Sequence, residues 1–156
     1  MRGSPQVLEL LHILSSTLLF GTGLGSAFAF WRAHKTNDAR IIAAVARGVV
    51  LADWVFTTPA VVIQPATGAA LVTIHGYPWT TPWLVAALLL YVLVGTCWIP
   101  VVWLQMRMRD LAQQAAQAGG PLPPLYHRCY RIWFALGWPA FAGVLLIFWL
   151  MVFKPG

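Results

Sequence analysis

Long apolar stretches alternate with short polar ones along this chain, and their lengths decide the fold class. Four apolar segments stand out, near residues 7–31, 48–74, 82–106 and 130–153. Each exceeds the roughly 20 residues that a helix needs to cross a bilayer. Because backbone groups in lipid must find their hydrogen bonds within the chain, each segment is predicted to be a helix. The pattern therefore predicts an all-α integral membrane protein with four spanning helices.

The polar connections between these segments are short, which favours a single unit. Helices joined by short loops pack as antiparallel neighbours, so residues 1–156 are predicted to form one transmembrane domain, a four-helix bundle. The polar stretch at residues 111–124 reads as a short helical extension followed by a Gly/Pro break, and hence as a loop rather than a domain boundary.

Glycines and prolines inside the segments predict local features of packing. Gly21 and Gly25 form a GxxxG pair, which lets another helix approach closely. Pro59 and Pro65 are expected to bend the second helix, because proline removes a backbone donor and crowds the preceding turn.

The composition supports a membrane environment. The chain is 60% hydrophobic and only 9% charged, whereas about 25% charged residues is usual in a soluble protein. The net charge of +6 would suggest nucleic acid on a soluble protein. Here the basic residues cluster between the apolar segments, where they set orientation, so no nucleic-acid partner is expected. Cys97 and Cys129 are isolated and are read as small apolar residues.

The basic residues are unevenly distributed between the two sides of the predicted bundle. Eight of the ten lie in the stretches 32–47 and 107–131. The other two are Arg2 and Lys154, and the connection at residues 75–82 contains no Lys or Arg. The positive-inside rule therefore predicts both termini outside, in a multi-pass protein of the bacterial inner membrane.

Histidines inside apolar segments are candidate functional residues, because ionisable groups are costly in lipid. His12 lies near the outer end of the first segment, with Glu9 and Ser16 on the same helical face. It is either a neutral imidazole hydrogen-bonded to a neighbouring helix or a ligand of a metal or haem iron. His75, at the outer end of the second segment, is either a solvated loop residue or a partner of His12. Two imidazoles at similar depth on different helices can provide both axial ligands of a haem.

A second candidate site lies in the second segment. One face there carries the small and polar residues Asp53, Thr57, Gln64 and Gly68. A buried carboxylate needs a partner or a proton, and Arg131 in the fourth segment is the expected partner of Asp53, with His127 one turn before it. This group is read either as a structural ion pair or as a quinone or proton site near the inner surface. His34, in the basic stretch, is expected to be solvated.

Three stretches carry a resemblance to a known family. They are "LH" at residues 11–12, "TPAVVIQPATGAAL" at 58–71 and "YRIWFALGWPAFAGVLLIFWLMVFKP" at 130–155. Together they resemble a bacterial family of predicted integral membrane proteins of unknown function, over nearly the whole chain. More distantly, the chain resembles the HemJ-type protoporphyrinogen oxidases and the CopD-type copper-resistance membrane proteins, which are also small helical membrane domains with an early histidine.

The HemJ resemblance implies a haem site. Proteins of that type bind haem b through the early histidine, which corresponds to His12 in this chain. Their second helix has a proline followed nine residues later by a glycine, matched by Pro59 and Gly68, and their last helix is closed by a basic residue and proline, matched by Lys154 and Pro155. The resemblance therefore implies that His12 holds haem b.

The same resemblance breaks at the positions linked to catalysis. The third-helix lysine associated with HemJ activity falls near Ala87, and no lysine occurs in that segment. The Asn–Glu pair before the fourth-helix proline is replaced by Leu-Gly-Trp at residues 136–138. These departures argue against protoporphyrinogen oxidation by this chain.

Three functional hypotheses follow. The leading one is a small inner-membrane b-type haem protein that exchanges electrons with a quinone or a protein partner, with His12 and His75 as candidate iron ligands. The alternative is a cofactor-free membrane scaffold or accessory subunit in which His12 is satisfied structurally. The third is copper handling of the CopD type. The sequence shows no nucleophile–base arrangement, phosphate loop or zinc-ligand spacing.

Overall fold

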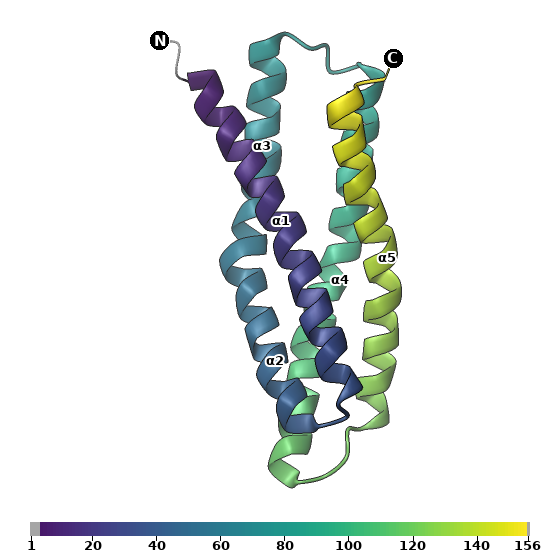
Figure 1. Ribbon diagram of the computed structural model, residues 1–156. Helices are drawn as coiled ribbons and strands as arrows, with labels where there is room; N and C mark the ends of the chain where they lie inside the picture. The colour runs from purple at the N-terminus through teal and green to yellow at the C-terminus, as the bar shows by residue number, and fades with distance from the viewer. Residues whose placement is uncertain (1–3, 156) are drawn as a thin grey trace.

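The computed structural model describes residues 4–155 and consists of helices joined by short connections (Figure 1). In chain order the elements are α1 (Ser4–Lys35), α2 (Ala39–Ala52), the π-helical turn η1 (Asp53–Thr57), α3 (Thr58–His75), α4 (Pro82–Ala118) and α5 (Pro124–Phe153). Because α2, η1 and α3 run on without a break, Ala39–His75 is one span. Arg2, which the charge pattern places outside, lies beyond the described residues.

All four predicted spans are confirmed. The described residues contain four helices long and apolar enough to cross a membrane. They alternate in direction, so the start of α1 and the end of α5 lie at the same end of the bundle (Figure 1). We call that end the terminal end, and the opposite end, which carries the connections at residues 35–39 and 118–124, the basic end.

The helices extend further than the apolar segments predict. The basic stretch at residues 32–47 is mostly helical, and only Thr36–Asp38 connects α1 to α2. The Oδ1 atom of Asp38 caps α2 by accepting from the backbone N–H groups of Arg40 at 2.8 Å and Ile41 at 3.3 Å. The segments predicted at residues 7–31 and 48–74 were too short because charged residues can lie on a helix that continues into the polar interface.

The main core lies at the basic end. Its wholly buried large side chains are Phe30, Ile42, Met108 and Tyr126, which come from α1, α2, α4 and α5 in turn. Leu111 and Ala112 belong to the same cluster, so the part of α4 beyond its apolar segment is packed. The expected helical extension and Gly/Pro break are confirmed: α4 ends at Ala118 and is capped by Gly119, whose φ of 64° is left-handed.

A smaller cluster closes the terminal end. Trp83 and Leu84 of α4 pack there against Val72 of α3 and Leu150 of α5. Lys154, just after α5, donates from Nζ to the Tyr77 hydroxyl at 3.1 Å and lies 5.7 Å from the Trp83 ring. This cation–π contact ties the end of α5 to the connection between α3 and α4.

The GxxxG pair does not mark a close helix contact. A Cβ atom added at Gly21 or Gly25 would meet nothing within 4 Å. Close approach occurs instead at Gly143 of α5, where an added Cβ would lie 2.6 Å from Val94 of α4. The expected interface at Gly21 and Gly25 is therefore absent from the described residues, and those glycines face open space.

The prolines of the second span distort it locally. The ring of Pro59 crowds the carbonyl four residues earlier, and the turn just before it is π-helical, with the Thr58 N–H bonded to the Asp53 carbonyl. Pro65 has no N–H to give to the Val61 carbonyl. The hydroxyl of Tyr91 on α4 donates to that carbonyl instead, at 2.5 Å. A helix break in lipid is thus repaired by a side chain from a neighbouring span.

The role of the hydrogen bond from Tyr91 to the Val61 carbonyl can be tested by replacing Pro65, which leaves that carbonyl without a backbone donor. Tyr91→Phe should lower the free energy of unfolding in detergent by about 1 kcal/mol, because it leaves the carbonyl unpaired. In a Pro65→Ala background a backbone N–H can serve the same carbonyl, so Tyr91→Phe should cost clearly less. Equal losses in both backgrounds, measured by chemical or thermal unfolding, would show that the hydroxyl has no such role.

Candidate functional site

His12 lies on α1 with its ring against α3. Its Nδ1 atom is 2.9 Å from the hydroxyl oxygen of Thr67, and its Nε2 atom is 3.1 Å from the side-chain nitrogen of Gln64. The ring is partly buried between the two helices. His12 is therefore held by two side chains of the same neighbouring helix, three residues apart.

This hydrogen-bond network assigns the ring proton of His12. The amide nitrogen of Gln64 only donates, so Nε2 is the acceptor and Nδ1 carries the hydrogen. Nδ1–H then donates to Thr67, whose hydroxyl donates to the Ile63 carbonyl at 2.8 Å. The imidazole is neutral in this arrangement, as a group in a water-poor site should be.

Ser15 completes the network from the α1 side. Its hydroxyl is buried and donates to the Oε1 atom of Gln64. Gly68 makes room for the ring, because a Cβ atom there would lie 3.1 Å from the Cε1 atom of His12. We call Ser15, His12, Gln64 and Thr67 the His12 network; it joins α1 to α3 through side chains alone.

The sequence anticipated part of this network. Gln64 and Gly68 were expected on one face of the second span, and that face does meet His12. Ser15 and Thr67 were missed, although each lies three residues from a residue singled out, which is the spacing of one helical face. Ser16, expected beside His12, instead donates to the Ile13 carbonyl of its own helix at 2.8 Å.

His75 has a different set of partners. Its Nε2 atom is 3.4 Å from Oε1 of Glu9, and its Nδ1 atom is 2.8 Å from the Leu71 carbonyl. The side chain is 43% exposed at the terminal end. His75 lies eight residues beyond Thr67, roughly 12 Å along α3 at about 1.5 Å per residue. The structure therefore places His12 on α1 and His75 on α3, at two levels of the same helix pair, and does not bring their rings to one point.

The predicted ion pair between Asp53 and Arg131 is wrong. Asp53 is buried, and its Oδ1 atom accepts from the Thr57 hydroxyl at 3.0 Å. Its Oδ2 atom has no hydrogen-bond partner. Arg131 is exposed on α5, and no ion pair joins the two in the described part of the chain. The sequence places Arg131 near the start of α5, at about the depth of Asp53, but it does not show which face of α5 carries the guanidinium.

The remaining histidines gather at the basic end. His34 stacks on Tyr130 with ring centroids 3.5 Å apart, and its Nδ1 atom is 3.2 Å from the hydroxyl of the buried Tyr126. His127 presents an edge to His34 at 6.0 Å. His34 is thus packed rather than solvated, contrary to expectation, and His127 belongs with His34 rather than with Asp53.

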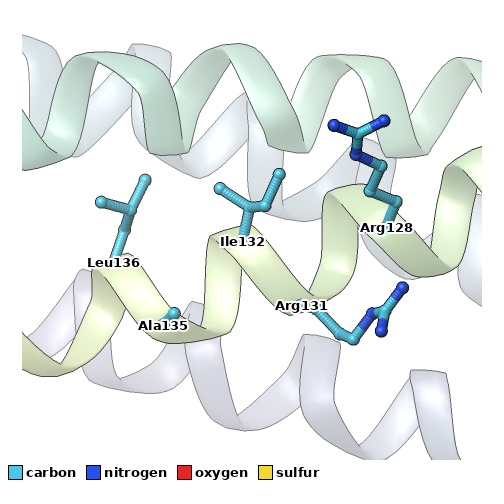
Figure 2. Close-up of a pocket in the computed structure, with 5 residues that line it drawn as sticks. All are labelled: Arg128, Arg131, Ile132, Ala135 and Leu136. Carbon is cyan, nitrogen blue, oxygen red and sulfur yellow. The ribbon is translucent and has the colours of Figure 1, made fainter.

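The described residues hold no group of three or more His, Cys, Asp and Glu side chains placed to bind a metal ion. Open hollows of about 510 Å³ and 270 Å³ lie at the basic end, away from His12. The larger one is formed on α5 by Arg128, Arg131, Ile132, Ala135 and Leu136 (Figure 2).

The fit of His12 against Gly68 yields a direct test. Gly→Ala inside a helix normally stabilises by about 1 kcal/mol, and Gly21→Ala, which meets open space, should show that gain. Gly68→Ala should lower the thermal stability in detergent instead, because the new methyl group displaces a ring held by two hydrogen bonds. Stabilisation of equal size at both positions would mean that His12 is not held against α3.

With the geometry described, the chain can be compared with known proteins. No curated protein and no solved structure matches it significantly. The family described as "Predicted integral membrane protein (DUF2269)" matches residues 6–155, which include every residue of the His12 network. The more distant likeness to HemJ-type and CopD-type proteins stays a prediction. The chain belongs to the DUF2269 family of predicted integral membrane proteins, whose function is unknown.

Proposed function

We propose that this membrane protein binds haem b, with His12 as the iron ligand. The observation that carries the proposal is the hydrogen bond from Nδ1–H of His12 to Thr67. An iron-ligating histidine keeps its other ring nitrogen hydrogen-bonded, which fixes the tautomer and the ring orientation. In the His12 network this leaves the lone pair on Nε2, the atom that would face iron.

The donor chemistry of the site fits haem, with one rearrangement. Gln64 now donates to Nε2, so its side chain has to turn aside for a ligand to approach. The glutamine side chain has several rotatable bonds. The hydrogen bond between Nδ1 of His12 and Thr67 does not depend on the position of Gln64. Gly68 lets the ring lie close against α3, which fixes its position. His75 is the candidate second ligand, and it would have to leave Glu9 to serve.

When bound, haem would supply one-electron redox chemistry. A quinone or another membrane protein belongs to this proposal as the electron-exchange partner. The residues of the chain have three roles: His12 binds, Thr67 holds the ring proton at Nδ1, and the apolar spans exclude water from the site.

A cofactor-free scaffold or accessory subunit is the second candidate, and it too has an observation in its favour. Every polar group of the His12 network has a partner within the chain, so the network also serves as a plain tie between α1 and α3. Copper handling of the CopD type gains no comparable support.

The proposal places the protein in the bacterial inner membrane with both termini outside. The basic end carries almost all the positive charge, which favours the cytoplasmic side.

Absorption spectra test the haem proposal. Protein from haem-replete cells should show a Soret band and sharpened visible bands after dithionite reduction. His12→Ala should abolish them, whereas Gln64→Leu, which frees the Nε2 lone pair, should keep or raise haem retention. His75→Ala should change the spectrum only if the iron has two protein ligands. A protein that stays colourless after incubation with hemin would exclude the haem proposal and favour the scaffold.

Cysteine labelling tests the orientation. In a background with Cys97→Ala and Cys129→Ala, single cysteines at Asn37 and Thr80 report on opposite ends of the bundle, and both positions are exposed. An impermeant maleimide added to spheroplasts should label Thr80→Cys but not Asn37→Cys. The reverse pattern would place the basic end outside.

A further inference from the structure

Each acidic side chain among the described residues contacts a group other than the exposed arginines of α5. Glu9 lies beside His75 at the terminal end, Asp38 caps α2, and Asp53 accepts from Thr57 in the bundle interior. Asp110 is paired with Arg109 at 2.8 Å. The positive charge on α5 therefore has no carboxylate to neutralise it among residues 4–155.

Arg128 and Arg131 are the uncompensated pair on α5. Both are exposed, and both line the hollow of about 510 Å³. Figure 2 shows Arg128 in a row with Ile132 and Leu136, while Arg131 leaves the helix on the other side beside Ala135. Both arginines line the same hollow, but their guanidiniums point apart, so Arg131 has to change its side-chain rotamer to share a ligand with Arg128.

The rest of this hollow is apolar. Ile132, Ala135 and Leu136 extend it from the arginines toward the middle of the membrane, and Ile132 is 44% exposed. The hollow has two cations at the membrane surface and apolar side chains that continue toward the middle of the bilayer. It is therefore complementary to an anionic head group with an attached acyl chain.

We propose that the hollow on α5 binds an anionic phospholipid, with its phosphate on Arg128 and Arg131 and an acyl chain over Ile132, Ala135 and Leu136. Guanidinium groups form charge-assisted, bidentate hydrogen bonds with phosphate oxygens. Basic pockets at the cytoplasmic ends of spanning helices are suited to such head groups. The site is independent of His12 and does not rest on the haem proposal.

The second hollow provides a matched contrast. It also contains two arginines, Arg40 and Arg47, but its other walls are Ala43 and Ala116 with the amides of Gln113 and Gln117. It has charge without the large apolar side chains that an acyl chain covers. Simple attraction of lipid to a basic surface would treat the two hollows alike, whereas a built lipid site would distinguish them.

Native mass spectrometry of the detergent-purified full chain tests the proposal. The chain is titrated with phosphatidylglycerol and, separately, with phosphatidylcholine, and the bound lipid is measured. Phosphatidylglycerol should bind more tightly than phosphatidylcholine. Removing both charges with Arg128→Gln and Arg131→Gln should weaken it about 30-fold, at about fivefold for each basic residue near a membrane surface. Arg40→Gln with Arg47→Gln removes the same charge and should leave that affinity unchanged.

Two further arms separate a lipid from a free phosphate. Ala135→Phe keeps both charges and fills the hollow, so it should weaken phosphatidylglycerol binding. Glycerol 3-phosphate, which has the head-group phosphate without acyl chains, should fail to displace the lipid. Equal losses from the two double variants, full affinity with Ala135→Phe, or displacement by glycerol 3-phosphate would each overturn the proposal. Unchanged melting temperatures confirm that the surface variants remain folded.

Discussion

The interior of a bilayer contains no water to complete a broken backbone hydrogen bond, and the second span is built around that constraint. Pro65 withholds an N–H from the Val61 carbonyl, and Tyr91 of α4 supplies the missing donor. At the π turn, both the backbone N–H and the hydroxyl of Thr58 reach the Asp53 carbonyl. Irregular backbone is tolerated in a membrane when another group satisfies it. Pro65 thereby leaves a carbonyl on the second span that a side chain of α4 satisfies.

The same constraint explains why the fold was readable from the sequence. Runs of apolar residues longer than a bilayer leave helices as the available solution, so four spans and their alternating direction follow from the residues alone. The helix ends did not follow, because Arg40 and Arg47 can lie on a helix at the polar interface as readily as in a loop. The 111–118 extension was anticipated since Gly119 and the prolines after it give an explicit stop signal.

The candidate site was only partly accessible to sequence reasoning. Helical spacing placed Gln64 and Gly68 on one face, but it does not say which helix that face meets. The pairing of Asp53 with Arg131 failed for this reason: α5 carries Arg131 on its exposed side, and rotation about a helix axis is decided by packing across the bundle. His34 was misread because its neighbours in sequence are basic, whereas its neighbours in space are Tyr126 and Tyr130.

The Nε2 lone pair of His12 can either accept the hydrogen bond from Gln64 or bind a ligand under the proposed function, but not both at once. While Gln64 donates to Nε2, the imidazole ties α1 to α3 on both sides of its ring. Under the proposed function, a ligand at Nε2 would replace one of these ties and leave the bond to Thr67 in place. Ligand uptake would then exchange a helix–helix contact for a helix–cofactor contact without demanding a new fold.

The π turn at Asp53–Thr57 has a consequence for how this chain can vary in length. Its i→i+5 bonding takes in one residue more than an α-helical turn, which rotates everything after it by about one residue position, roughly 100° at 3.6 residues per turn. Before the turn, α2 packs mainly on α4; after it, α3 packs mainly on α1 and presents Gln64 and Thr67 to His12. Losing one residue between positions 53 and 57 would restore a regular helix with that face still toward α1, because residue i+5 of a π turn occupies the place that residue i+4 has in an α-helix. The π turn can therefore lose one residue without changing which face of α3 meets His12, whereas a one-residue deletion between Thr58 and Gln64 would rotate that face by roughly 100°.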